Sequence, residues 1–235
     1  MEAILRLENI KKTFGEGEVV VHALRGVSLE IEKGSFAALA GPSGSGKTTL
    51  LNVVSGLDRV TSGRVFVDGK ELSTMSASAL SRLRLLSIGF VFQAYNLIPV
   101  LTAYENAEYV LMLQGVAPAA RRQRVMEVLA QVGLTGLEKR FPRELSGGQQ
   151  QRVAIARAIA ARPALVLADE PTANVDSKTA ESLLDLMARL NQEQGVTFVF
   201  STHDRNVMRR AQRLILLKDG MIDQNGTAQD LDTHP

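Results

Sequence analysis

A glycine-rich stretch, GPSGSGKTT at residues 41–49, constrains the fold more than any other part of the sequence. It follows the apolar run FAALA and precedes TTLLNVVSGL, whose pattern is helical. In this strand–loop–helix context, the spacing G-x-x-x-x-G-K-[ST] is typical of a phosphate-binding loop. Bare glycines let backbone N–H groups turn toward an anion, Lys47 can reach the β- and γ-phosphates of a nucleotide, and the Thr48 hydroxyl can bind Mg²⁺. We expect nucleotide contacts from Gly41, Pro42, Ser43, Gly44, Ser45, Gly46, Lys47, Thr48 and Thr49.

Two other interpretations of this loop explain less of the pattern. A glycine-rich turn with an incidental lysine would require neither the preceding strand nor the following helix. A dinucleotide-binding fingerprint would need a third glycine at position 49, which is threonine.

Buried strands and helices alternate along most of the chain, which predicts an α/β fold with a mostly parallel sheet covered on both faces. A continuous apolar run predicts a buried strand at 36–40, further buried strands are predicted at 164–168 and 196–201, and a short strand is predicted at 88–92. An amphipathic helix is expected at 177–194 and a final hairpin at 213–223. Strands at 4–10, 27–32 and 64–67 predict an additional antiparallel layer near the N-terminus.

We expect one domain over residues 1–235. From about 102 to 140 the pattern is helical and lacks strand signals, which suggests a helical subdomain inserted into the α/β core. This subdomain is placed at about 94–159, and the α/β core and β subdomains at 1–93 and 160–235.

Composition narrows the possible partners. The formal net charge is only +2, so the sequence gives no reason to expect nucleic acid or anionic lipid as a partner. The chain has no cysteine, which excludes disulfides and thiolate metal sites. The first residues, MEAILRLENIKK, do not resemble a signal peptide, and no window approaches the ~18 apolar residues of a membrane span. Any membrane contact is therefore expected through a partner.

Polar residues follow three of the predicted strands. Asp169 and Glu170 end the run ALVLADE, His203 follows FVFST, and Gln93 follows IGFVF. Ligands of open α/β sheets bind at the carboxyl ends of the strands, so Asp169 is suited to Mg²⁺ and Glu170 to the general base of a hydrolysis. His203 could contact a γ-phosphate there. The alternatives are acids that end a strand in solvent, a structural or exposed histidine, and an exposed glutamine.

The stretch LSGGQQQRVAIARA, residues 145–158, begins a predicted helix with two glycines. A serine at the N-cap needs no glycine after it, so bare backbone at a helix N-terminus suggests an anion at close approach. An ordinary capped helix would explain Ser146 but not Gly147 and Gly148.

Together these motifs resemble the ATP-binding cassette family, over nearly the whole chain. The phosphate loop, Gln93, LSGGQ, LADE and His203 occur in the family's order, and LSGGQ is the element that separates cassettes from other P-loop enzymes. The resemblance implies an ATPase with ATP and Mg²⁺ as cofactors, in which two copies pair head to tail around two nucleotides. The signature of each copy then caps the γ-phosphate held by the other.

The resemblance also implies residue roles. Lys47, Glu170 and His203 would be catalytic, and Thr48, Gln93 and Asp169 would surround Mg²⁺. Phe14 would stack on adenine, for which a buried core phenylalanine is the alternative. Ala173 stands where many members have serine, which leaves the role of that position open. Besides the phosphate loop, the expected nucleotide contacts are Phe14, Gln93, Ser146, Gly147, Gly148, Gln149 and Asp176.

The stretches FQAYNLIPVLTAYENAEYVLML and STHDRNVM resemble cassettes that serve lipoprotein-release and macrolide-efflux systems. This subgroup implies a separate membrane permease, a hydrophobic or lipoprotein cargo, and a location on the cytoplasmic face of the inner membrane. The apolar residues at 94–101 suggest a groove for a permease helix, unless they pack inside the helical subdomain.

Three other classes of cassette protein are alternatives. Ribosome-associated cassettes usually carry two cassettes and a charged linker, which this sequence lacks. Chromosome and DNA-repair ATPases insert coiled coils between the phosphate loop and the signature, and no sustained heptads occur here. A regulatory cassette of the cell-division or antibiotic-sensing type would carry the same motifs, so it stays open.

Overall fold

The computed structural model describes residues 2–15, 20–227 and 229. Its main sheet has six strands in the order β10 (Met221–Gly226), β9 (Arg213–Lys218), β3 (Phe36–Ala40), β8 (Thr197–Thr202), β7 (Leu165–Asp169) and β6 (Ile88–Val91). All of these strands run parallel except β10, which pairs antiparallel with β9. The predicted mostly parallel sheet is confirmed, and the expected final hairpin is β9–β10.

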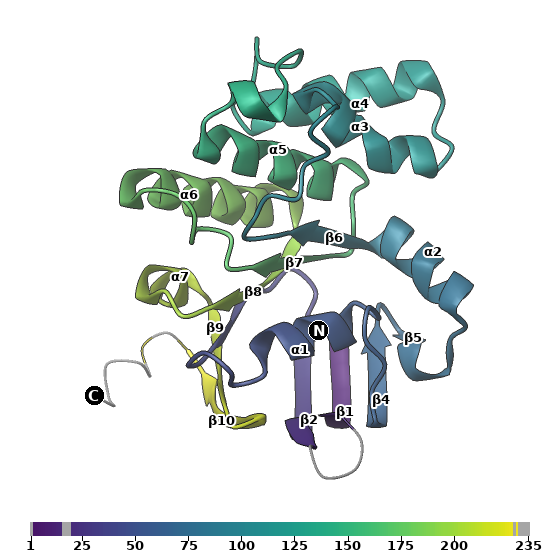
Figure 1. The fold of residues 1–235 in the computed structure, drawn as a ribbon, viewed down its shortest axis with the longest axis vertical. Coiled ribbons are helices and arrows are strands. Elements are labelled where there is room, and N and C mark those ends of the chain that lie inside the picture. Colours follow the sequence, from purple (N-terminus) through teal and green to yellow (C-terminus); the bar gives the residue numbers. More distant parts are fainter. Residues whose placement is uncertain (1, 16–19, 228, 230–235) are drawn as a thin grey trace.

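A second, antiparallel sheet has the order β2 (Val21–Glu32), β1 (Ala3–Phe14), β4 (Ser62–Val67) and β5 (Lys70–Glu71). It lies below the main sheet in Figure 1. This confirms the predicted antiparallel layer near the N-terminus. The short strand β5 was not predicted.

The described helices are α1 (Lys47–Val54), α2 (Ala77–Ser87), α3 (Ala103–Leu113), α4 (Pro118–Gln131), α5 (Gly147–Ala160), α6 (Ser177–Gln194) and α7 (Arg205–Arg210), with 3₁₀ turns at Leu72–Thr74 and Pro142–Glu144. Helices α3, α4 and α5 form the upper layer of Figure 1. Helices α2 and α7 were not predicted. In α2 only Leu80, Leu83 and Ser87 are buried, so its apolar pattern is thin.

The two faces of the main sheet belong to two hydrophobic clusters, and successive residues of a strand alternate between them. In β3, Phe36, Ala38 and Ala40 join the cluster on the side of α3 to α6. Ala37 and Leu39 join the other cluster, which also holds α1 and the antiparallel sheet. A strand covered on both faces therefore reads as a continuous apolar run.

The helical layer shares one core with the main sheet. Val125 and Val128 of α4 and Ala107 of α3 belong to the same cluster as Phe198 and Phe200 of β8. This packing is continuous between the helical layer and the sheet. The single domain and the subdomain bounds stay predictions.

No helix among the described residues is both long and apolar enough to cross a membrane.

Candidate functional site

The phosphate loop leaves β3 and enters α1, as the sequence predicts. The Gly46 N-cap of α1 has a φ of 104° and offers no side-chain acceptor, so the first N–H groups of the helix point into the loop without a cap. A Cβ on Gly46 would lie 2.7 Å from the carbonyl oxygen of Ala23, which requires glycine in addition to the left-handed φ. The loop is therefore shaped as a nest of backbone donors for an anion.

Lys47 is buried inside this loop. Its Nζ donates to the carbonyl oxygens of Gly41 at 2.7 Å and Pro42 at 3.0 Å, and the residue is only 8% exposed. Nearby, the buried Ser45 Oγ has no hydrogen-bond partner among the described residues. Phosphate oxygens would supply acceptors to both groups, because each carries a donor with no other charged partner.

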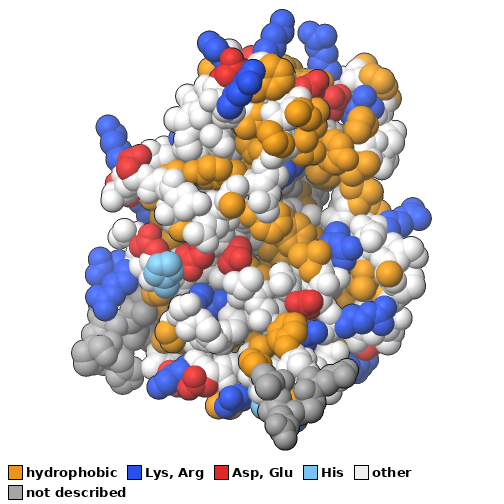
Figure 2. Space-filling model, viewed as in Figure 1, with side chains coloured by type: hydrophobic (Ala, Val, Ile, Leu, Met, Phe, Trp, Pro, Cys, Tyr) orange, Lys and Arg blue, Asp and Glu red, His pale blue; other side chains and the backbone are white. Residues whose placement is uncertain are grey.

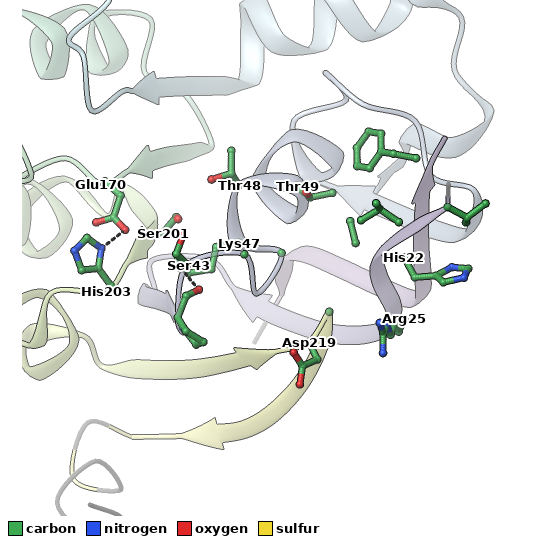
Figure 3. A pocket seen from close by; sticks show the side chains of 18 of the residues that line it. His22, Arg25, Ser43, Lys47, Thr48, Thr49, Glu170, Ser201, His203 and Asp219 are labelled. Carbon is green, nitrogen blue, oxygen red and sulfur yellow. Dashed lines mark hydrogen bonds and ion pairs between the residues drawn. The ribbon is translucent and has the colours of Figure 1, made fainter. Parts of the chain in front are cut away.

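The carboxyl ends of β7 and β8 place an acidic pair beside a histidine. Asp169 pairs in register with Ser201, and the next residue, Glu170, donates its N–H to the Ser201 carbonyl at 2.9 Å. Glu170 Oε1 lies 2.7 Å from His203 Nδ1, and Thr202 Oγ1 donates to Glu170 Oε2 at 3.5 Å. Figure 3 shows the Glu170–His203 pair facing the loop that carries Lys47.

Glu170 has a left-handed backbone, with φ 45°. A non-glycine residue in this region stores strain that the surrounding structure must hold, and such residues cluster at functional sites. The Glu170 side chain is 16% exposed and that of His203 is 71% exposed. The carboxylate is thus partly shielded while the imidazole stands at its open side.

These groups share one cavity of about 1030 Å³. Besides Gln93, Glu170 and His203, its lining includes Phe14 and the loop residues Pro42, Ser43, Gly44, Gly46, Lys47, Thr48 and Thr49. The predicted residues Gly41, Ser45 and Asp169 do not line it. One cavity therefore brings together the backbone N–H groups of the phosphate loop, the side-chain oxygens of Thr48 and Gln93, and the Glu170–His203 pair.

Phe14, the last residue of β1, also lines this cavity. It is 40% exposed, so it is not the buried core phenylalanine of the alternative interpretation. Lys12 Nζ lies 4.6 Å from the centroid of the Phe14 ring, and the exposed Val20 and Val21 line the same cavity. The stacking of an adenine on Phe14 stays a prediction.

Three residues for Mg²⁺ were predicted, and their chemistry fits. Thr48 and Gln93 line the cavity with a hydroxyl and an amide oxygen. Asp169 Oδ1 is buried without a hydrogen-bond partner among the described residues, so it holds an unused acceptor. Oxygen donors of this kind suit Mg²⁺, and no group of three His, Asp or Glu residues in the described ranges offers an alternative metal site. When bound, Mg²⁺ would neutralise charge on the β- and γ-phosphates.

The signature residues lie outside this cavity. Ser146 caps α5, with its Oγ accepting from Gln149 N at 3.3 Å and Gln149 Oε1 accepting from Ser146 N at 2.9 Å. Asp176 likewise caps α6, accepting from Thr179 N at 3.0 Å and Thr179 Oγ1 at 2.6 Å. These hydrogen bonds lower the pKa of the Asp176 carboxyl. Contact of Ser146, Gly147, Gly148, Gln149 and Asp176 with a nucleotide would have to come from a second copy, which stays a prediction.

The glycine pair has a reason within the chain that the sequence did not reveal. A Cβ on Gly147 would lie 2.7 Å from Tyr95 Oη, and one on Gly148 would collide with Thr179 Cγ2. Packing against neighbouring segments therefore also excludes a side chain at both positions, so an anion is not needed to explain the two glycines.

Sequence reasoning missed several residues of the cavity. Ser201 lines it, and its buried Oγ has no partner among the described residues. His22 and Arg25 of β2 and Asp219 of the β9–β10 turn line the opposite end (Figure 3). Ser201 could have been found as a polar residue at a strand end, whereas the other three come from elements that only the fold brings together.

A phosphate loop, a strand-end carboxylate with its histidine and a helical layer that carries LSGGQ define an ATP-hydrolysing P-loop cassette. The protein-family model for "ABC transporter" matches residues 24–173, and the chain belongs to that family. It is an ATPase that uses ATP and Mg²⁺, and it is of the kind that forms the nucleotide-binding part of transporters.

Relatives match over most of the chain. An uncharacterized ABC transporter ATP-binding protein of Methanocaldococcus jannaschii, MJ0796, is 44% identical, covering 97% of this chain and 99% of its own. The lipoprotein-releasing system ATP-binding protein LolD 1 of Rhodopseudomonas palustris is 44% identical, covering 94% and 99%. The macrolide export ATP-binding/permease protein MacB of Mannheimia succiniciproducens is 44% identical over 99% of this chain, which spans 35% of that longer protein.

A solved structure agrees with the fold. MJ0796, described as a dimeric post-hydrolysis state bound to ADP and Pi, superposes with a TM-score of 0.88 at 44% identity, covering 95% of this chain and 98% of that chain.

Proposed function

We propose that two copies of this chain pair around two Mg-ATP and hydrolyse them to drive a separate membrane permease. The observation that carries the proposal is the single cavity in which Lys47 and Thr48 face the Glu170–His203 pair. Lys47 binds the β- and γ-phosphates, Glu170 takes a proton from the attacking water, and His203 holds Glu170 and the γ-phosphate end. The dimer described for MJ0796 supports the pairing.

Glu170→Gln tests the chemical step. The amide keeps the shape of Glu170 but cannot accept a proton, so ATP hydrolysis should fall by about 10²–10⁴-fold, the usual contribution of a general base. The same variant should accumulate as a dimer with Mg-ATP, measured by size-exclusion chromatography with light scattering. Hydrolysis at the wild-type rate would remove Glu170 from the role of base.

The permease would dock on an apolar surface formed by exposed side chains of α2, α3 and the segment before α3. These are Leu86, Val100, Tyr109, Met112 and Leu113, which are 36–77% exposed. Gln114 Nε2 donates to the Leu85 carbonyl at 2.8 Å and ties α3 to α2 beneath this surface. Figure 2 shows apolar side chains gathered over α3 and continuing toward α2. Exposed apolar patches on monomers commonly mark protein interfaces.

Within the expected groove at 94–101, not every apolar residue is free to contact a permease. Leu97 is partly buried and packs against the core cluster, so an acidic residue there would damage the fold itself. Val100, at 77% exposure, is the appropriate probe. Val100→Asp in the Glu170→Gln background should abolish capture of a permease from detergent-solubilised native membranes. Met221→Asp, on an exposed apolar residue of β10, is the matched control.

The proposed cargo is supported by the names of two relatives alone. LolD and MacB are named for lipoprotein release and macrolide export, so we propose extraction or export of a lipoprotein or another hydrophobic cargo. The chain would then sit on the cytoplasmic face of the membrane, held there by its permease. Capture of only soluble partners by the Glu170→Gln variant would favour the regulatory or soluble cassette alternatives instead.

A further inference from the structure

The segment that follows β6 has an unusual backbone held by α5. Tyr95 and Asn96 both lie in the left-handed region, with φ of 59° and 48°. Such a pair is strained for non-glycine residues and needs support from its surroundings. Arg157 of α5 supplies it, because its guanidinium donates to the carbonyl oxygens of Asn96 at 2.6 Å and Tyr95 at 3.0 Å. These two hydrogen bonds from the Arg157 guanidinium fix the position of the Tyr95 backbone.

From this position the Tyr95 side chain reaches the segment that follows Glu170. Tyr95 Oη donates to the Asn174 carbonyl at 3.0 Å, and Asn174 Nδ2 donates back to the Gln93 carbonyl at 2.9 Å. The two bonds close a reciprocal latch between residues that are about 80 positions apart in the sequence. Asn174 lies between Glu170 and Asp176, so the latch holds the middle of the loop that joins them.

The same hydroxyl also meets the start of the signature helix. Gly147 lies so close that a Cβ on it would be 2.7 Å from Tyr95 Oη. Gln151, one turn further along α5, donates to the carbonyl oxygens of Pro171 at 2.7 Å and Phe92 at 3.4 Å. The segment after β6, the segment after Glu170 and the start of α5 are therefore tied to one another around Tyr95.

We propose that Tyr95 is a positioning residue for ATP-driven pairing: its hydroxyl fixes the Asn174 segment and the start of α5 as one surface for the second copy. This inference rests on the dimer proposed above. Tyr95 lines no part of the nucleotide cavity, so it acts on pairing and not on the binding of ATP to a single copy. Movement of Gln93 would reach the same surface through the bond that its carbonyl accepts from Asn174 Nδ2.

The test is Tyr95→Phe in the Glu170→Gln background. Each copy loses one neutral hydrogen bond, whose net worth corresponds to a factor of about 2 to 10. The bond is made in the single chain as well, so pairing loses only the part of it that orders the surface beforehand; for two copies, the dissociation constant of the Mg-ATP-bound dimer should rise by about tenfold, measured by analytical ultracentrifugation. Binding of Mg-ATP to the dilute single chain, measured by fluorescence titration, should not change.

Tyr104→Phe is the matched control, since the Tyr104 hydroxyl also makes one hydrogen bond, to Glu108 at 3.3 Å, within α3. A second variant, Asn174→Ala, removes the other half of the latch and keeps the carbonyl that accepts from Tyr95. Its effect combined with Tyr95→Phe should be smaller than the sum of the two single effects, as for residues in one network.

Two outcomes overturn the proposal and are distinguishable. If the Glu170→Gln chain forms a dimer with Mg-ATP and Tyr95→Phe leaves its dissociation constant equal to that of the Tyr104→Phe control, the latch has no role in pairing. If the Glu170→Gln chain stays monomeric with Mg-ATP, the proposed dimer fails and this inference fails with it. A merely structural role would lower the unfolding temperature and leave the dissociation constant unchanged.

Discussion

Gly148→Ala, compared in the wild-type and Thr179→Ser backgrounds, separates the two reasons for a bare backbone at the start of α5. Within the chain, the new Cβ would collide with Thr179 Cγ2, and Thr179 cannot rotate freely because its Oγ1 donates to Asp176 at 2.6 Å. In the proposed dimer, the same Cβ would also keep the partner's γ-phosphate away from the helix N-terminus. Both effects reduce activity, so a single variant cannot tell them apart.

The expected magnitudes differ between the two effects. Overpacking costs about 1–3 kcal/mol, and replacing glycine by alanine in a helix returns about 1 kcal/mol. The net loss is about 1 kcal/mol, which lowers the unfolding temperature of a chain of this size by about 2–4 °C. Loss of a preorganised contact to the γ-phosphate would cost about 100-fold in ATP hydrolysis, much more than this instability explains.

Thr179→Ser provides the discriminating background. Serine lacks the colliding Cγ2 but keeps the hydroxyl that donates to Asp176. We expect Gly148→Ala/Thr179→Ser to regain the unfolding temperature of Thr179→Ser, followed by differential scanning fluorimetry, while its steady-state ATPase rate stays about 100-fold low. Recovery of both the unfolding temperature and the ATPase rate would refute the reasoning, because packing within one chain would then account for Gly148 completely.

Three further predictions concern single charged groups. Lys47→Ala should weaken ATP binding by about 10- to 100-fold, measured by equilibrium titration, because it removes charge-assisted hydrogen bonds to the phosphates. Asp169→Asn should raise the Mg²⁺ concentration needed for hydrolysis without lowering the unfolding temperature, since Asp169 Oδ1 is buried without a partner among the described residues. The hydrogen bonds from Thr179 hold the pKa of Asp176 below its usual value of 3.8. The Asp176 charge therefore stabilises the fold fully above about pH 3.8, and this contribution is lost as the pH falls through the lowered pKa of the folded state. The difference in urea stability between the wild type and Asp176→Asn should therefore shrink below about pH 4.

Local signals made much of the fold predictable. Helix α6 was predicted with the bounds that the structure has, since Asp176 caps its start and Gly195 ends it with a φ of 66°. The strands β3, β7 and β8 were found because both of their faces are buried, so apolar residues occupy successive positions in the middle of each run. The phosphate loop was found because its spacing and its flanking elements are contiguous in the sequence.

Features that depend on distant contacts could not be predicted. The left-handed backbone of Glu170 is held by its bond to the Ser201 carbonyl, 31 residues later in the chain. The intrachain reason for Gly148 lies in Thr179, on another helix. Such constraints arise only when the helices and strands pack together, so no local sequence pattern predicts them.

Strand order explains why the sequence predicts where each functional loop lies along the chain but not which loops lie side by side. Every parallel strand of the main sheet delivers its following loop to the same edge, and this much follows from the α/β pattern. That β6 lies at the end of the sheet beside β7 is visible only in the fold. Because these two strands are neighbours, the loops after Val91 and Asp169 must run side by side, and the bonds between Tyr95, Asn174 and Gln93 become possible. With β3 on the far side of β8, the phosphate loop has no such link to Tyr95, so loss of the Tyr95 hydroxyl can alter how copies pair while the phosphate loop of a single copy keeps its shape.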